Sequence, residues 1–355
     1  MQKINQAPNS DGYSIIRMLS AFVHDSLGII FMPLYDKSLF GLLRDENFWD
    51  YLEGDDKEME ATQTTLLIQM GKLASAIRHL HHIQVADSEE TVNEDARPLF
   101  GSICHRDIKP GKILVRGKGE QLQLVLCDFE HAILYRENEQ IPLGSDRTGD
   151  AGFQPPPPTA ELISPKDYYE KYDVWSFGCT LFEVLTWILD GCKWRKLFDD
   201  ARTTGLNQQL WGRSDQSTNR GSIEIKPQIR TFRANLQTSF GARQVGLRNA
   251  LRLTFGMLRI DDTARLSITE VVQQWDAAMP LVKYAIPMQD LPEATGFVDL
   301  TSEEGSHAFT PTDETLHECP PFEDSIGPLK LSVNHEASKL LLRTLRWFGG
   351  CKSIC

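Results

Sequence analysis

The sequence predicts an α+β fold in which short strands accompany a mainly helical body, and three patterns carry this prediction. Apolar and β-branched runs at residues 13–23 and 28–35 flank a polar turn, which predicts a β-hairpin. Over residues 62–82, apolar side chains recur at steps of three and four, which predicts one buried face of a long helix. Residues 173–189 are apolar nearly all round, as expected of a helix at the centre of a domain.

Shorter signals predict the remaining elements. Runs at 112–115 and 122–126, on either side of an Arg-Gly-Lys-Gly turn, predict a second hairpin. Helical patterns return at 243–258 and at 267–278, and the second opens with the serine and glutamate of a capping box.

Two polar stretches, near 84–98 and 190–240, are predicted to be insertions in the main domain. Within the second, residues 200–240 are rich in Arg, Gln, Asn and Ser and are interpreted as a surface excursion without assigned secondary structure.

Composition limits the class of protein. The 355 residues are 41% hydrophobic and 24% charged, which is enough for a sizeable core. Since no run of about 18 apolar residues and no signal peptide is recognisable, we expect an intracellular protein of the cytoplasm and/or nucleus. The seven cysteines are scattered and are interpreted as reduced thiols.

Most of the formal net charge of −12 is local, because residues 290–324 hold ten acidic and no Lys or Arg residues. The rest of the chain therefore lacks the basic surface of a nucleic-acid-binding protein. We predict an acidic disordered tail over 286–335 and a basic amphipathic helix over 336–355.

Two acidic motifs are candidates for phosphoryl-transfer chemistry. The segment 105–110 (HRDIKP) follows the long helix, and the segment 127–129 (CDF) ends the second hairpin. Phosphoryl transfer needs an acceptor for the proton of the attacking hydroxyl and a carboxylate that holds Mg²⁺ on the phosphates. Asp107 and Asp128 are the candidates for these two functions, and Lys109 is placed to neutralise charge on the transferred phosphate.

In order and separation, these motifs resemble the catalytic loop and the Asp-Phe-Gly element of protein kinases, and Lys109 is typical of the serine/threonine type. The resemblance implies ATP and Mg²⁺ as cofactors and a protein as substrate. It also implies a kinase-like fold with a mainly α-helical C-lobe over 36–285 and an incomplete β N-lobe, of which residues 1–35 are a remnant.

The resemblance extends to residues with structural roles. Asp173 matches the aspartate that accepts hydrogen bonds from the catalytic-loop backbone, and Arg265 belongs to a late Asp-x-x-x-Arg element. Glu161 is expected to pair with Arg265; in the alternative, Pro157 stands at the glutamate position and the four prolines around it form a rigid surface strip. Further structural positions implied by the family are His105, Arg106 and Phe129.

The segment before the first predicted helix resembles the hinge that binds adenine. Met32 stands at the gatekeeper position, the backbone of Pro33 and Tyr35 would bond the adenine, and Leu114 would lie beneath its ring. The plain alternative for Met32 and Leu114 is ordinary core packing, which is expected with or without adenine binding.

The sequence also departs from the family pattern. No glycine-rich loop and no strand lysine precede the hinge, and residues 1–6 are all that can correspond to the regulatory helix. We interpret this as a start upstream of Met1 or a lost first exon. Lys112 stands where the family has a metal-binding asparagine, and an ammonium offers donors but no acceptor. Glu130 replaces the glycine of the Asp-Phe-Gly element.

One further position is left open, because either Asp150 or Thr148 occupies the place of a threonine that touches the catalytic aspartate and lysine. The sequence thus predicts a serine/threonine kinase domain impaired as given; the alternatives are a pseudokinase that acts as a binding scaffold through the 190–240 region or the tails, and a defective fragment. Packing of the C-terminal helix on the domain is favoured over membrane contact. No oligomeric state is predicted.

Overall fold

The computed structural model describes residues 14–24, 27–48, 55–85, 99–136, 149–158, 164–203, 208–215, 220–240 and 245–278. Several predictions concern residues outside these ranges: the regulatory-helix remnant at 1–6, the acidic tail, the C-terminal helix, Thr148 and Glu161.

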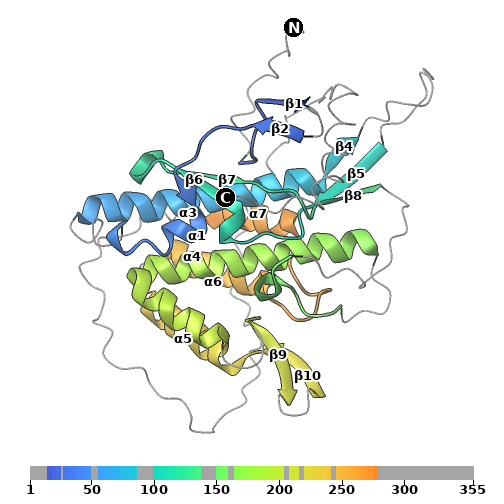
Figure 1. The fold of residues 1–355 in the computed structure, drawn as a ribbon. Coiled ribbons are helices and arrows are strands. Elements are labelled where there is room, and N and C mark those ends of the chain that lie inside the picture. The colour runs from blue at the N-terminus through green and yellow to red at the C-terminus, as the bar shows by residue number, and fades with distance from the viewer. Residues whose placement is uncertain are drawn as a thin grey trace.

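The first predicted hairpin is confirmed. Strands β1 (Ser20–His24) and β2 (Leu27–Phe31) pair antiparallel, with Ser20 opposite Phe31. Leu19, directly before β1, also bonds across the hairpin, its N–H donating to the Phe31 carbonyl at 2.8 Å, whereas Ile15 forms a parallel bridge with Leu126. In Figure 1 this hairpin lies at the top, away from the helices α4, α5 and α6.

The second hairpin is also confirmed and carries the residues of interest. Strands β6 (Ile113–Arg116) and β7 (Gln123–Leu126) pair antiparallel, and β3 (Lys37–Ser38) adds to the free edge of β6. The connection uses a glycine at position 117 with φ of +74°, a left-handed conformation that favours glycine. Helix α1 (Leu39–Leu42) follows β3 directly, capped by the Ser38 side chain, which accepts a hydrogen bond from the N–H of Gly41.

The long helix, α3 (Asp56–His81), buries the predicted apolar stripe. It begins earlier than the apolar pattern indicates, because the Asp55 side chain accepts hydrogen bonds from the N–H groups of Lys57 and Glu58. α3 packs on α7 (Ile268–Ala278) at a close approach where a Cβ on Gly71 would overlap Trp275. α7 starts with the predicted capping box of Ser267 and Glu270.

The central helix, α4 (Pro165–Thr203), crosses the middle of the molecule in Figure 1 and packs against α5 (Pro227–Ser239) and α6 (Val245–Met257). The stretch predicted to be buried is fully enclosed, including Trp175 and Trp187. The helix continues past this stretch to Thr203 and includes Gly191, whose φ of +56° lies in the left-handed region that favours glycine.

The interpretation of residues 200–240 as a surface excursion is wrong. Strands β9 (Trp211–Asp215) and β10 (Arg220–Ile225) form an antiparallel hairpin, and α5 follows. Ile229, Phe232 and Leu236, at steps of three and four, are buried against the domain. Because these few apolar residues are diluted by polar ones, the stretch has the composition of a loop although its apolar face packs on the core.

A three-stranded sheet was not predicted. It joins β4 (Ile83–Val85), β5 (Leu99–Cys104) and β8 (Ile133–Arg136) in the order β4-β5-β8. Residues 84 and 85, placed by the sequence in a polar insertion, are therefore strand residues. The described residues also include short 3₁₀ helices of three residues each, at Pro110–Lys112, Gly119–Gln121 and Ala151–Phe153.

The fold is thus helix-rich with small sheets, as the predicted α+β class requires. Among the described residues, no helix combines the length and the apolar character needed to cross a membrane.

Candidate functional site

The catalytic-loop candidate is held by a buried carboxylate on α4. The Asp173 carboxylate is 1% exposed and accepts hydrogen bonds from the backbone N–H groups of His105 and Arg106, each at 2.7 Å. Arg106 has a φ of +63°, which is uncommon for a residue with a side chain and is maintained here by these bonds. This is the contact that the resemblance implies for Asp173.

His105 joins this loop to the segment after β7. Its Nε2–H donates to the carbonyl of Cys127 at 3.0 Å, and its Nδ1 accepts from the N–H of Asp107 at 3.3 Å. The imidazole lies 4.8 Å, between ring centroids, from Phe129. Burial lowers the pKa of His105, so the imidazole is neutral near pH 7 and acts as a spacer between the two acidic segments.

Asp107 lies at the centre of the candidate site. Its side chain is 2% exposed, and its Oδ1 accepts a hydrogen bond from the N–H of Asp150 at 2.9 Å. Lys109 Nζ lies 3.2 Å from Asp107 Oδ1 and 3.4 Å from Asp150 Oδ2. Asp150 therefore touches both residues, and the alternative, Thr148, is outside the described residues. An aspartate here adds a negative charge where the family threonine is neutral.

Gly149 allows the segment that carries Asp150 to lie close to Asp107. It has a φ of +87°, and a Cβ at this position would lie 2.5 Å from the Arg106 carbonyl oxygen and 3.0 Å from Asp107 Oδ1. No side chain fits there without moving the backbone, so the segment that carries Asp150 can lie on the catalytic loop only with glycine at this position.

We expect Gly149→Ala to lower the free energy of unfolding by roughly 1–3 kcal/mol, since it adds a strained φ and a backbone clash. Gly111→Ala is the matched control, because a Cβ there meets nothing within 4 Å. Urea unfolding of both variants measures the difference. Equal stability of the two variants would show that segment 149–150 does not lie on the loop.

Asp128 and Lys112 form an ion pair. The Lys112 ammonium is in direct contact with Asp128 Oδ2 and lies 3.8 Å from Asp107 Oδ2. Burial raises the pKa of Asp128, but the Lys112 ammonium outweighs it, and the pKa is lowered. Burial lowers the pKa of Lys112, but Asp128 and Asp107 outweigh it, and the pKa is raised. Both groups are charged at neutral pH, and Asp128 has a φ of +63°.

The arrangement does not fit the magnesium site that the family implies. The carboxylate expected to bind Mg²⁺ is already paired with an ammonium, and Mg²⁺ needs oxygen ligands in a nearly octahedral arrangement. Lys112 offers three donors and no acceptor, so it cannot complete such a site. The partner of Asp128 is therefore a lysine.

The hinge candidates lie beside β6. The N–H of Asp36 donates to the carbonyl of Val115 at 2.9 Å, and Ser38 pairs with Leu114 across β3 and β6. Leu114 and the hinge residues Pro33 and Tyr35 are half-buried. Met32 is 53% exposed, so ordinary core packing, the plain alternative, is wrong for it.

Arg265 is anchored by backbone oxygens. Its guanidinium donates to the carbonyls of Arg259, Lys171 and Ile260 and lies over the ring of Trp175. Its predicted partner, Glu161, is outside the described residues. In the alternative interpretation the prolines around Pro157 form a surface strip, but the first two of the four, at positions 155 and 156, are buried.

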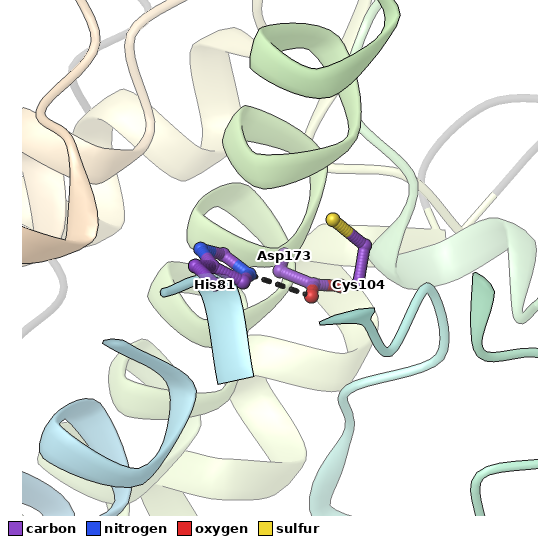
Figure 2. Close-up of side chains that lie close together, drawn as sticks. All are labelled: His81, Cys104 and Asp173. Atoms are coloured by element: carbon purple, nitrogen blue, oxygen red, sulfur yellow. Dashed lines mark hydrogen bonds and ion pairs between the residues drawn. The ribbon is translucent and has the colours of Figure 1, made fainter. Parts of the chain in front are cut away.

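A buried His-Cys-Asp cluster lies behind the loop. Figure 2 shows His81 bonded to Asp173, with a His81 Nε2–Asp173 Oδ2 distance of 3.0 Å, whereas the Cys104 thiol lies 3.6 Å from the Ser102 hydroxyl. These residues have the spacing of metal ligands, but Asp173 already accepts two backbone hydrogen bonds. Burial raises the pKa of the Cys104 thiol well above its usual value, which keeps it protonated and a poor ligand. The cluster therefore serves to hold the catalytic loop.

Sequence reasoning missed a second buried charge cluster, beside a cavity of about 420 Å³ that opens next to Lys109 and Asp150. Glu183 on α4 is 1% exposed and pairs with Arg202, and Arg44 lies 3.9 Å from its other oxygen. Isolated charges within helical patterns carry no signal of such pairing. The cavity is lined by Phe40, Arg44, Lys109, Pro110, Gly111, Asp150, Phe153, Glu183, Asp199, Arg202, Thr203 and Gln208.

Comparison with known proteins identifies the family. The family model described as protein kinase domain matches residues 2–275, most of the chain. The chain belongs to the protein kinase family. Members of this family use ATP and Mg²⁺ in general, and their catalytic loop and Asp-Phe-Gly element carry the residues that Asp107 and Asp128 match here.

Kinases of several organisms are similar to parts of this chain. The MAP kinase kinase mkk-4 of Caenorhabditis elegans is 38% identical over 101 residues, which cover 28% of this chain and 25% of that protein. The serine/threonine-protein kinase PKH2 of Saccharomyces cerevisiae is 28% identical over 193 residues, 52% of this chain and 14% of that protein. A putative mitogen-activated protein kinase kinase kinase 7-like protein of Drosophila melanogaster is 31% identical over 151 residues, 42% and 31% respectively. Each match spans less than a third of the relative's own length.

Proposed function

We propose that this chain is a protein serine/threonine kinase domain, impaired in phosphoryl transfer, that passes the γ-phosphoryl group of ATP to a protein hydroxyl. The contacts among Asp107, Lys109 and Asp150 carry the proposal, since they place a buried carboxylate and an ammonium at one point beside a cavity. Similarity to serine/threonine kinases supports the choice of acceptor.

In this proposal each oxygen of Asp107 has its own function. Oδ1 is engaged by the N–H of Asp150, which fixes the orientation of the carboxylate and leaves Oδ2 to accept the proton of the attacking hydroxyl. As that O–H bond breaks, the oxygen bonds to the γ-phosphorus and the bond from phosphorus to the ADP oxygen breaks. The Lys109 ammonium lies close enough to neutralise charge that develops on the transferred group.

Impairment follows from the charges around this carboxylate. Lys112 lies 3.8 Å from Asp107 Oδ2, the oxygen that must take up the proton, so its ammonium competes with the attacking hydroxyl for this oxygen. The Asp150 carboxylate also competes with the phosphate for the ammonium of Lys109. A scaffold function is the second candidate, favoured by the Lys112–Asp128 pair, in which the ammonium compensates the charge of Asp128 without any ligand.

Asp107→Asn is the test of this function. We expect weak transfer of radiolabel from γ-labelled ATP to a generic protein substrate by the wild-type chain, and a loss of about a hundredfold or more in the variant. Lys72→Asn, on the exposed side of α3, is the control and should retain the wild-type rate. Transfer that is absent, or equal in wild type and Asp107→Asn, contradicts phosphotransferase function and favours the scaffold.

A further inference from the structure

We infer that the Lys112 ammonium is a resident cation that takes the place of a divalent metal at Asp128, so that this site receives nucleotide phosphates without Mg²⁺. The identity of the ligand rests on the proposed function. The exclusion of metal rests on the contacts of Lys112 alone.

The first support is the position of the ammonium between two carboxylates from different segments. Lys112 ends the turn after the catalytic loop, and Asp128 follows β7. The Lys112 ammonium contacts the Asp128 carboxylate and lies 3.8 Å from the Asp107 carboxylate. A bridging position between these two carboxylates is where a cation lowers the repulsion between them most.

The second support is that Lys112 is held from its backbone. Its N–H donates to the carbonyl of Lys109 at 2.9 Å, and its own carbonyl accepts from the N–H of Cys127 at 3.0 Å. The residue next to Asp128 is thus tied to Lys112 by a main-chain bond. The lysine and the carboxylate therefore face each other because of the β6–β7 pairing, and their contact does not depend on two long side chains meeting at the surface.

The third support is the donor capacity left for a ligand. Lys112 compensates the charge of Asp128, and Lys109 lies 3.2 Å from Asp107 and 3.4 Å from Asp150. A divalent ion at Asp128 would meet the ammonium at close range and could bind only after the lysine moved away. The ammonium has three N–H donors, and Asp128 takes one, so a phosphate oxygen can be bound beside it.

Manganese binding measured by electron paramagnetic resonance tests the metal part without nucleotide. We expect Lys112→Asn to bind one Mn²⁺ about tenfold or more tightly than the wild type, because a unit positive charge is replaced by an oxygen ligand. The acidic residues at 290–324 will bind some Mn²⁺ in every variant. Asp128→Asn and the double variant Lys112→Asn/Asp128→Asn measure that background, and Lys72→Asn controls for the loss of one positive charge.

The expected result is a gain in Lys112→Asn that disappears in the double variant. Equal Mn²⁺ affinity in wild type and Lys112→Asn, or a gain that survives loss of Asp128, overturns the inference. Circular dichroism confirms that each variant is folded before it is compared.

A fluorescent trinitrophenyl-ATP titration tests the phosphate part. We expect the wild type to bind equally well in EDTA and in Mg²⁺, and Lys112→Asn to bind about tenfold or more weakly in EDTA than in Mg²⁺. Wild-type binding that requires Mg²⁺ overturns the inference. If no variant binds nucleotide, the phosphate part and the proposed function both fail, whereas the manganese result still decides whether Lys112 replaces the metal.

Discussion

Replacing Asp173 with alanine is expected to lower the free energy of unfolding by about 3–5 kcal/mol, because three buried donors lose their acceptor at roughly 1–3 kcal/mol each. The donors are the N–H groups of His105 and Arg106 and the Nε2–H of His81. Without the carboxylate, the left-handed conformation of Arg106 also loses its support, so the catalytic loop should lose its position.

Urea unfolding followed by circular dichroism measures this loss, and the slope with denaturant shows whether the unfolded reference state has changed. Asp276→Ala, an exposed position on α7, is the matched control and should change stability by less than about 0.5 kcal/mol. Asp173→Asn keeps one acceptor oxygen, so its loss of stability should lie between those of Asp173→Ala and Asp276→Ala. A loss below about 1 kcal/mol in Asp173→Ala would show that these hydrogen bonds do not hold the loop.

Arg202→Met is expected to cost about 3–5 kcal/mol, because it leaves the Glu183 carboxylate buried without its main partner. Arg202 also donates to the carbonyl of Gly152 at 3.0 Å and to that of Gln208 at 3.2 Å, so it ties α4 to the segment after Asp150. Glu183 Oε2 has no hydrogen-bond partner among the described residues, and Arg44 alone cannot replace the lost contact.

The double variant Glu183→Gln/Arg202→Met separates the cost of the unpaired buried charge from the cost of the lost carbonyl contacts and packing. It removes the buried charge as well as its partner, and we expect it to recover more than half of the stability lost in Arg202→Met. A double variant as unstable as the single one would assign the loss to the carbonyl contacts and to packing.

The cost of Arg202→Met should also depend on pH. Burial raises the pKa of Glu183, and Arg202 is the first of the groups that act in the opposite direction. A carboxyl whose pKa is raised on folding binds its proton more tightly in the folded state, so stability falls as pH rises from the unfolded pKa through the folded one. Removing Arg202 raises the folded pKa further and widens this window.

We therefore expect the difference between wild type and Arg202→Met to be smallest below about pH 4, the range where an ordinary glutamate is protonated, and to grow with pH. Urea unfolding across this range tests the sign. The double variant lacks the carboxyl, so its difference from the wild type should not grow with pH. A constant difference between the wild type and the single variant would contradict the prediction.

The local elements could be predicted because their causes lie within a few residues of sequence. The stripe of α3, the turn between β6 and β7 and the capping box of Ser267 and Glu270 each depend on neighbours at fixed spacing. The motifs around Asp107 and Asp128 were recognisable for the same reason, since a short segment carries each whole pattern.

The parts that sequence could not predict depend on contacts between distant segments. The sheet β4-β5-β8 pairs residues from three separate regions, and the polar stretch before α5 packs through a minority of its side chains. Pairing energy of this kind is decided by which surfaces meet, and local composition does not contain that information.

For the candidate site, the sequence alone determined which chemical groups are present: the carboxylates of Asp107 and Asp128, the ammonium of Lys109, and a lysine at position 112 where an oxygen ligand was expected. Only the tertiary structure decided what these groups face. In the structure the Lys112 ammonium pairs with the Asp128 carboxylate, and the Arg202 guanidinium pairs with the Glu183 carboxylate. The N–H of Asp150 donates to the Asp107 carboxylate. The physical reason is that electrostatic interactions depend on distance and burial, which are set when the loop, the hairpin and α4 pack together.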